Sequence, residues 1–158
     1  MSEGDIQRDL DRRAPGRGPR SSARREIDRV EILSGIFEGR TTGTPISLVI
    51  SNRDHDPSAY DEMRDVFRPG HGDFTYHRKY GIRDHRGGGR ASGRETAARV
   101  AAGAVAKKIL AAEGIKVLAY TAELGGVAIA KFDPEAAEKG SLRCPDPEAA
   151  RIMEAKLD

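Results

Sequence analysis

The residues best suited to chemistry lie in a glycine- and arginine-rich segment, residues 86–92, that reads RGGGRAS. Glycines let backbone N–H groups approach an anion, and arginines donate charge-assisted hydrogen bonds to phosphate or carboxylate oxygens. A helix beginning directly after the segment adds partial positive charge. The segment matches neither the Walker pattern nor a GxGxxG turn after a strand. It predicts a site for a phosphorylated anion; the alternative is a flexible turn whose arginines face water.

His71 is the candidate for proton transfer. It stands between Gly70 and Gly72, and imidazole is the side chain whose proton is mobile near neutral pH. A single loop histidine is more often a solvated side chain. The arginines that flank His71 in the sequence favour a functional role for it. The other three histidines, His55, His77 and His85, are weaker candidates.

A second group of basic residues lies near the N-terminus. It suits a clamp for phosphate or carboxylate as well as it suits a solvated basic turn. This basic group consists of Arg12, Arg13, Arg17, Arg20, Arg24 and Arg25. Elsewhere in the sequence, no His, Cys, Asp or Glu spacing resembles a metal site, and no Ser/His/Asp triad is visible.

Composition limits the function classes. The chain has 158 residues, the size of one domain, and its 27 Lys and Arg nearly balance its 25 Asp and Glu. This balance disfavours nucleic acid as a partner. The single cysteine, Cys144, favours a reduced, cytoplasmic protein. There is no apolar run of the roughly 20 residues that a membrane helix needs, and the polar N-terminus is no secretory signal.

The elements expected to position these residues begin with a helix over residues 2–13, capped by Ser2 and Asp5. Proline and glycine make residues 14–23 a turn. Two apolar runs, 31–37 and 45–51, predict antiparallel strands joined by a turn, and 52–62 reads as a surface loop. The alternation of Phe74, Tyr76, Tyr80 and Ile82 with polar residues predicts a short extended segment.

A long helix follows the glycine segment, which is itself expected to be non-helical. Ser92 and Glu95 form an S-x-x-E capping box, the helix spans 94–112, and Gly114 ends it. Alanines on most of its sides predict a central helix buried between sheets. A hairpin broken by Gly125 and Gly126 is expected within 115–130, followed by surface helices over 134–139 and 147–157.

Several stretches together closely resemble chorismate synthase over nearly the whole chain: DLDRRAPG, EILSGIFEG, TTGTPI, RPGHGDFTY and KYGIRDHRGGGRASGRETAARVAAGAVAKK. The resemblance implies a carbon–oxygen lyase that eliminates phosphate and a proton from 5-enolpyruvylshikimate 3-phosphate, giving chorismate for aromatic amino acid biosynthesis. It also implies reduced FMN as cofactor, with NADPH as a candidate reductant. The implied fold is an α+β sandwich with central helices between antiparallel sheets, in a homotetramer.

The resemblance also implies residue roles. His71 matches the histidine of the family's RPGH motif, which takes part in proton transfer to the flavin. A flavin-binding segment is matched by Arg90, Ala91 and Ser92. NADP or substrate binding is assigned to Arg13, Arg20 and Arg94, although Pro19 stands where the family pattern has an arginine, so Arg20 takes the role by a one-residue slip.

Departures from the family pattern point to a partial domain over 1–158. The family's Gly-Glu-Ser-His-Gly motif, with a second histidine, precedes the matched region, and the family's C-terminal half follows it. Gly72, His85 and Gly93 replace residues that are more often Ala, Tyr and Ala. We therefore expect little or no activity from this chain alone. The alternative function is a non-catalytic anion-binding or assembly module that pairs with a separately encoded remainder.

Overall fold

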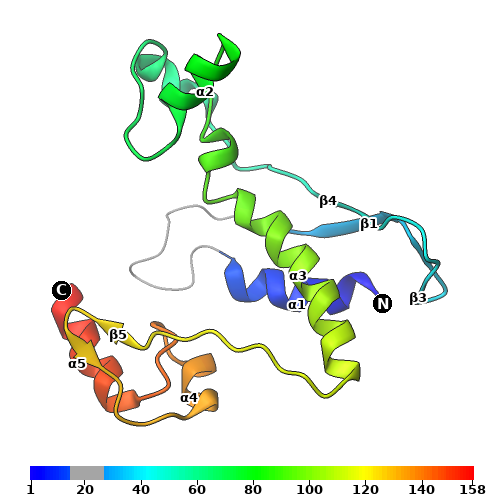
Figure 1. Cartoon of the computed structure of the whole chain (residues 1–158), viewed down its shortest axis with the longest axis vertical. Coiled ribbons are helices and arrows are strands. Elements are labelled where there is room, and N and C mark those ends of the chain that lie inside the picture. Colours follow the sequence, from blue (N-terminus) through cyan, green and yellow to red (C-terminus); the bar gives the residue numbers. More distant parts are fainter. Residues whose placement is uncertain (15–26) are drawn as a thin grey trace. The chain divides into compact units, whose positions relative to one another are not determined.

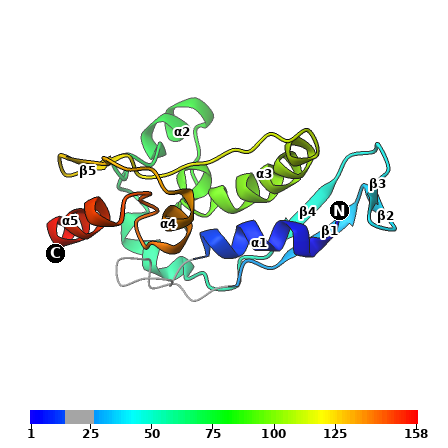
Figure 2. The same ribbon diagram turned by 90° about the horizontal axis from the view of Figure 1, so that it is seen from below.

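The computed structural model describes residues 1–14 and 27–158, and these divide into two compact units, Met1–Gly114 and Ile115–Asp158. Both units combine helices with short antiparallel strand pairs, so the α+β class is confirmed (Figures 1 and 2). The turn expected over 14–23 lies, apart from Ala14, outside the described residues.

The first helix, α1 (Glu3–Arg13), forms as the sequence predicts. The backbone N–H of Ser2 donates to Asp5 Oδ2 at 2.7 Å, which is one half of the capping box. Ile6 and Leu10, four residues apart, are completely buried on one face of the helix. This face packs against the long helix α3 (Glu95–Ala112), and α1 and α3 lie against each other in both views (Figures 1 and 2).

Two antiparallel strands also form as expected, β1 (Val30–Ser34) and β4 (Ser47–Ile50). The connection between them holds a small hairpin of β2 (Ile36–Phe37) and β3 (Arg40–Thr41), which the sequence did not indicate. Gly35 separates β1 from β2 with φ of +83°, and a Cβ there would lie 2.7 Å from the carbonyl oxygen of Pro45. Only glycine fits this turn, because the backbone of the neighbouring strand passes so close.

The surface position expected for 52–62 is confirmed, because all of these residues except Tyr60 are exposed. The segment is not entirely loop, since it contains a 3-10 helix, η1 (Pro57–Met63), capped by the side chain of Asp56. The expectation for the next segment is wrong. The extended segment expected over 74–82 is the helix α2 (Asp73–Tyr80), flanked by Gly72 and Gly81 in left-handed conformations. The alternation of aromatic residues was misleading because most of them are exposed on this short helix and make no sheet face.

The long helix α3 (Glu95–Ala112) matches the expected range, 94–112, to within one residue. It follows a short 3-10 turn, η2 (Gly89–Ala91), in the segment that the sequence predicted to be non-helical. Its N-cap is Arg94 and it has no side-chain cap, so the capping box of Ser92 and Glu95 is wrong. At its other end Gly114 has φ of +73°, which suits its expected role in ending the helix.

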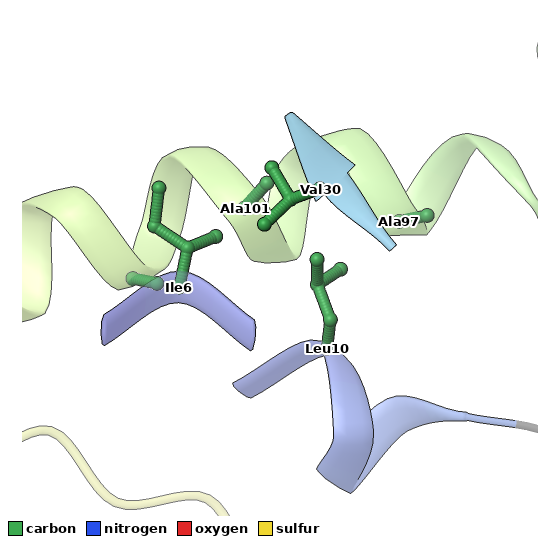
Figure 3. Close-up of a cluster of buried hydrophobic side chains, with 6 residues drawn as sticks. Ile6, Leu10, Val30, Ala97 and Ala101 are labelled. Carbon is green, nitrogen blue, oxygen red and sulfur yellow. The ribbon is translucent and has the colours of Figure 1, made fainter. Parts of the chain in front are cut away.

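The core of the first unit lies between α1, β1 and α3 (Figure 3). Small alanines on α3 let the larger side chains of α1 and β1 approach closely. The opposite side of α3 is exposed, and Ile109 on it is 64% exposed, so the helix is not buried on most sides as the sequence suggested. The buried residues of this core are Ile6, Leu10, Val30, Ala97, Ala101 and Ala104.

The second unit contains the expected hairpin and both expected helices. Strands β5 (Glu123–Leu124) and β6 (Val127–Ala128) are joined by Gly125 and Gly126, both with positive φ as a two-residue hairpin turn requires. The helices are α4 (Pro134–Lys139) and α5 (Pro147–Leu157). Asp146 caps α5 through the N–H groups of Glu148 and Ala149, and Cys144 is a buried thiol in the small core.

Candidate functional site

The glycine-rich segment folds as a tight turn at the start of α3. A Cβ on Gly88 would lie 2.7 Å from the Cβ of Ser92, so glycine is needed there for the turn to close. The hydroxyl of Ser92 accepts from the N–H of Arg94 at 3.2 Å, and this local bond takes the place of the expected cap on Glu95. The turn brings the flavin-binding candidates Arg90, Ala91 and Ser92 together at the beginning of the helix.

Arg90 is an exposed cation held by one carboxylate. Its Nη1 donates to Glu95 Oε2 at 2.9 Å, and the Arg90 side chain is 76% exposed. Glu95 raises the pKa of Arg90, and Tyr76 of α2 makes a smaller contribution in the same direction. Arg90 therefore stays charged and reaches solvent, as an anion-binding residue must.

Arg13 and Arg94 point inward and share the carboxylate of Asp28. Both Nη1–Oδ distances are 2.5 Å, and the Asp28 side chain is 1% exposed. Arg13 also donates to the carbonyl oxygen of Gly93 at 3.1 Å, and Arg94 donates to that of Ser51 at 2.8 Å. These two guanidinium groups connect α1, the segment before β1 and the start of α3.

His71 lies in an exposed loop before α2. Its Nδ1 is 2.9 Å from the carbonyl oxygen of Pro69. This contact favours the tautomer with the proton on Nδ1, which leaves Nε2 as the atom that can accept a proton.

Asp73, directly after this loop, is buried between two arginines. Arg68 contacts the carboxylate in a bidentate manner at 3.0 and 3.2 Å, and Arg83 donates at 2.6 Å. The hydrogen bond from Arg68 is the largest of several causes that lower the pKa of Asp73 to about 2. Arg68 Nη2 also donates to the carbonyl oxygen of Gly87 at 2.7 Å, so the loop of His71 is joined to the glycine-rich segment.

A groove of about 760 Å³ runs between β4 and α3. At one end it is lined by the glycines, Ser92 and Arg94, and along its length by aliphatic side chains. It therefore combines polar groups, Glu95 and Asn52 among them, with an apolar wall, as sites for ligands with both polar and apolar parts do. Its lining includes Leu48, Ile50, Gly87, Gly88, Gly89 and Ala98.

Other candidates are placed as follows. Arg20 lies outside the described residues, as do Arg17, Arg24 and Arg25. His55 and His77 are exposed, and His85 Nε2 is buried, 3.8 Å from an Asp61 oxygen. Among the described residues, no group of three His, Cys, Asp or Glu side chains could hold a metal ion. No helix in the described part of the chain has the length and apolar character to cross a membrane.

Sequence reasoning missed the two buried carboxylates that organise this site. Asp28 gives no signal, because its partners Arg13 and Arg94 lie 15 and 66 residues away. Asp73 carries a weak signal, since Arg68 precedes it by five residues across two glycines, a spacing that lets a loop close on itself.

Comparisons with known proteins cover the whole chain. The family model described as chorismate synthase matches residues 1–158. A chorismate synthase of Syntrophus aciditrophicus is 62% identical over 100% of this chain and 46% of that protein. Those of Desulfatibacillum aliphaticivorans and Methanococcoides burtonii are 58% and 56% identical over 100% and 96% of this chain, and 44% and 43% of their own lengths. The chain thus spans less than half the length of these relatives.

Proposed function

Because this chain belongs to the chorismate synthase family, we propose that it supplies part of a site that eliminates phosphate and a proton from 5-enolpyruvylshikimate 3-phosphate. Reduced FMN is the proposed cofactor, with NADPH as a candidate reductant. The observation that carries the proposal is the link between the two loops, in which Arg68 joins the segment of His71 to the segment of Arg90 and Ser92.

The residues present suit a flavin phosphate. Gly87, Gly88 and Gly89 line the groove without side chains that would separate the backbone from a ligand, and Arg90 supplies an exposed charge. Beside them, Ser92 lines the same groove, whose aliphatic wall suits a flat ring. The chemistry that reduced FMN supplies when bound is electron density for the breaking C–O bond.

This chain's own residues have three tasks in the proposed reaction. The glycine segment and Arg90 hold and orient anionic oxygen atoms. His71, with Nε2 exposed, accepts or donates a proton as charge develops. Arg13 and Arg94, carried over as NADP or substrate contacts together with Arg20, would act from their positions on Asp28, where their charges are already partly neutralised.

The wider assembly follows from the same proposal. The relatives are more than twice as long as this chain, so the complete site includes residues that it does not contain. We propose a cytoplasmic protein in which α3 becomes a central helix between antiparallel sheets, within a homotetramer. The chain alone is then expected to show little or no turnover.

The deciding experiment supplies the missing parts. The chain is mixed with separately produced segments of the Syntrophus aciditrophicus relative that precede and follow its matched region (together, the complementary half). Reduced FMN and 5-enolpyruvylshikimate 3-phosphate are added, and chorismate is measured. We expect product only from the mixture. His71→Ala should lower the rate by about 100-fold or more, whereas His55→Ala, at another exposed loop histidine, should leave it unchanged. Equal rates for the two variants would remove His71 from the mechanism.

The exposed face of α3 favours one alternative, a non-catalytic anion-binding or assembly module. Ala98, Ala102 and Ile109 are exposed on this helix, as an unpartnered packing surface would be. FMN titration of the chain, alone and with the complementary half, separates the two functions. Association without any gain in FMN affinity, and without chorismate formation, would favour the module.

A further inference from the structure

The position of His71 is not set by packing around its loop. Gly70 and Gly72 have φ of +73° and +69°, and a Cβ built on Gly70 would meet no atom within 4 Å. His71 itself is exposed. Two local bonds also hold the loop, from the His71 N–H to the Arg68 carbonyl oxygen at 3.4 Å and from the Thr75 hydroxyl to that of Gly72 at 2.8 Å. Because two left-handed glycines leave such a loop many conformations, a buried contact adds to its definition.

The carboxylate of Asp73 closes this loop. It accepts from the backbone N–H of Arg68 at 3.0 Å, at the opposite end of the loop, and also from the Arg68 guanidinium. The Asp73 side chain is 7% exposed, and the side chains of Arg68 and Arg83 are 14% and 8% exposed. Charge-assisted bonds that are shielded from water hold their geometry better than exposed ones do.

The two arginines extend this closure to neighbouring segments. Arg68 Nη2 bonds to the carbonyl oxygen of Gly87 at 2.7 Å. Arg83 Nη2 bonds to the carbonyl oxygens of Met63 and Arg64, at 2.8 and 2.6 Å. One carboxylate therefore fixes the end of η1, the His71 loop and the glycine-rich segment relative to one another.

We propose that Asp73 is a positioning residue, whose carboxylate, acting through Arg68, sets where His71 lies relative to the glycine-rich segment. Its importance for catalysis rests on the proposed function, in which both segments serve one reaction. Asp73 itself is not proposed to touch the substrate or the flavin, because its oxygens are occupied by arginine donors.

An electrostatic role and a positioning role of Asp73 predict opposite effects of Asp73→Asn on anion binding. The substitution removes one negative charge beside two arginines, so a purely electrostatic role predicts tighter binding of an anion such as FMN. A positioning role predicts weaker binding, because the glycine segment loses its link to the loop. Arg68→Lys is a second variant that keeps every charge, but a single ammonium cannot reproduce the planar fork that contacts both Asp73 and Gly87.

The test is amide hydrogen exchange and imidazole ¹⁵N NMR on the full 158-residue chain without ligand. In both variants we expect the amides of Gly87, Ala91 and Ser92 to exchange about tenfold faster or more. His71 should change from one tautomer to a mixture, while amides in the middle of α3 keep their wild-type rates. Glu138→Gln is the matched control, since Glu138 also pairs with an arginine, Arg143, but is 47% exposed and belongs to the second compact unit.

Two results would overturn the proposal. One is amide exchange of the glycine-rich segment at the wild-type rate in Arg68→Lys. This result would overturn the proposal even if Asp73→Asn fails to fold. The other is an equal rise in exchange throughout α1 and α3, which would make Asp73 a residue of general stability only. Failure of the wild-type chain and its complementary half to bind FMN or form chorismate would count against the proposed function and leave these measurements unaffected.

Discussion

Arg94 Nη1 and Asp28 Oδ1 lie 2.5 Å apart, although the two residues are 66 positions apart in the sequence. Arg94 is the N-cap residue of α3, and Asp28 lies two residues before β1. With Arg13 on the other oxygen, Asp28 has two cations around one carboxylate, so the start of α3 is fixed to the strand and to α1. The candidate site is built directly on this connection.

Asp28→Asn should strongly destabilise the first unit. The change leaves two partly buried guanidinium groups without their counter-charge, which costs about 3–5 kcal/mol in comparable pairs. Urea unfolding followed by circular dichroism measures the loss. Asp84→Asn, which breaks an exposed pair, should change the unfolding free energy far less; similar losses in both variants would contradict the buried role of Asp28.

Asp73 should make the first unit sensitive to acid. Its pKa is lowered to about 2 in the folded chain from the ordinary value of 3.8, mainly by the hydrogen bond from Arg68, so its stabilising effect is present above pH 4 and is lost as pH falls towards 2. The difference corresponds to about 2 kcal/mol. Denaturant unfolding between pH 6 and 2 should show a shallower pH dependence in Asp73→Asn than in wild type, and parallel curves would refute this.

Leu10→Ala tests the helix pair in the core. Leu10 is completely buried between α1 and α3, so truncation should cost about 2–5 kcal/mol through lost burial and a cavity. Ile109→Ala on the exposed side of α3 should cost less than about 0.5 kcal/mol. Thermal unfolding distinguishes them, and equal midpoints would show that the α1–α3 contact contributes little.

Gly35→Ala and Gly39→Ala separate the destabilisation caused by backbone strain from that caused by a steric clash. Both glycines have positive φ, +83° and +75°, so alanine at either costs about 1 kcal/mol or more. Only at Gly35 would the new Cβ meet a neighbouring backbone, 2.7 Å from the oxygen of Pro45. We expect Gly35→Ala to be clearly the less stable variant by urea unfolding, and the reverse order would contradict the described turn.

Glu95→Gln should strengthen anion binding. In the structure Glu95 Oε2 accepts a hydrogen bond from Arg90 Nη1 at 2.9 Å, and an anionic ligand must compete with this ion pair. Removing an exposed partner of this kind is worth up to about 1 kcal/mol, or roughly fivefold in affinity. Titration with FMN or inorganic phosphate measures the change, and weaker binding by Glu95→Gln would mean that Glu95 supports the site and does not compete in it.

Local elements were predictable from the sequence, and the site's internal connections were not. Ser2 with Asp5, and Asp146 before Pro147, mark helix starts because their bonds reach only two or three residues. The same kind of signal failed at Ser92, whose hydroxyl found a nearer donor, the N–H of Arg94.

Arginine placement shows the limit of sequence reasoning more clearly. The glycine-rich motif indicated an anion-binding role for Arg90, and the family resemblance implied one for Arg13 and Arg94. Arg90 is exposed, whereas Arg13 and Arg94 are mostly buried, with Arg94 also lining the groove. Arg13 and Arg94 bind the carboxylate of Asp28, which is distant from both in the sequence. Which guanidinium groups face a ligand depends on such long-range partners, and no local pattern reveals them.

The packing of α1 on α3 has a consequence for synthesis of the chain. Leu10 meets Ala101 and its neighbours in the core, but about 90 residues separate them. At a translation rate of about 5–20 residues per second, α1 is made roughly 5–20 s before the helix that covers it. During that interval Ile6 and Leu10 lack the α3 side chains that pack on them in the folded chain, because α3 has not yet been synthesised.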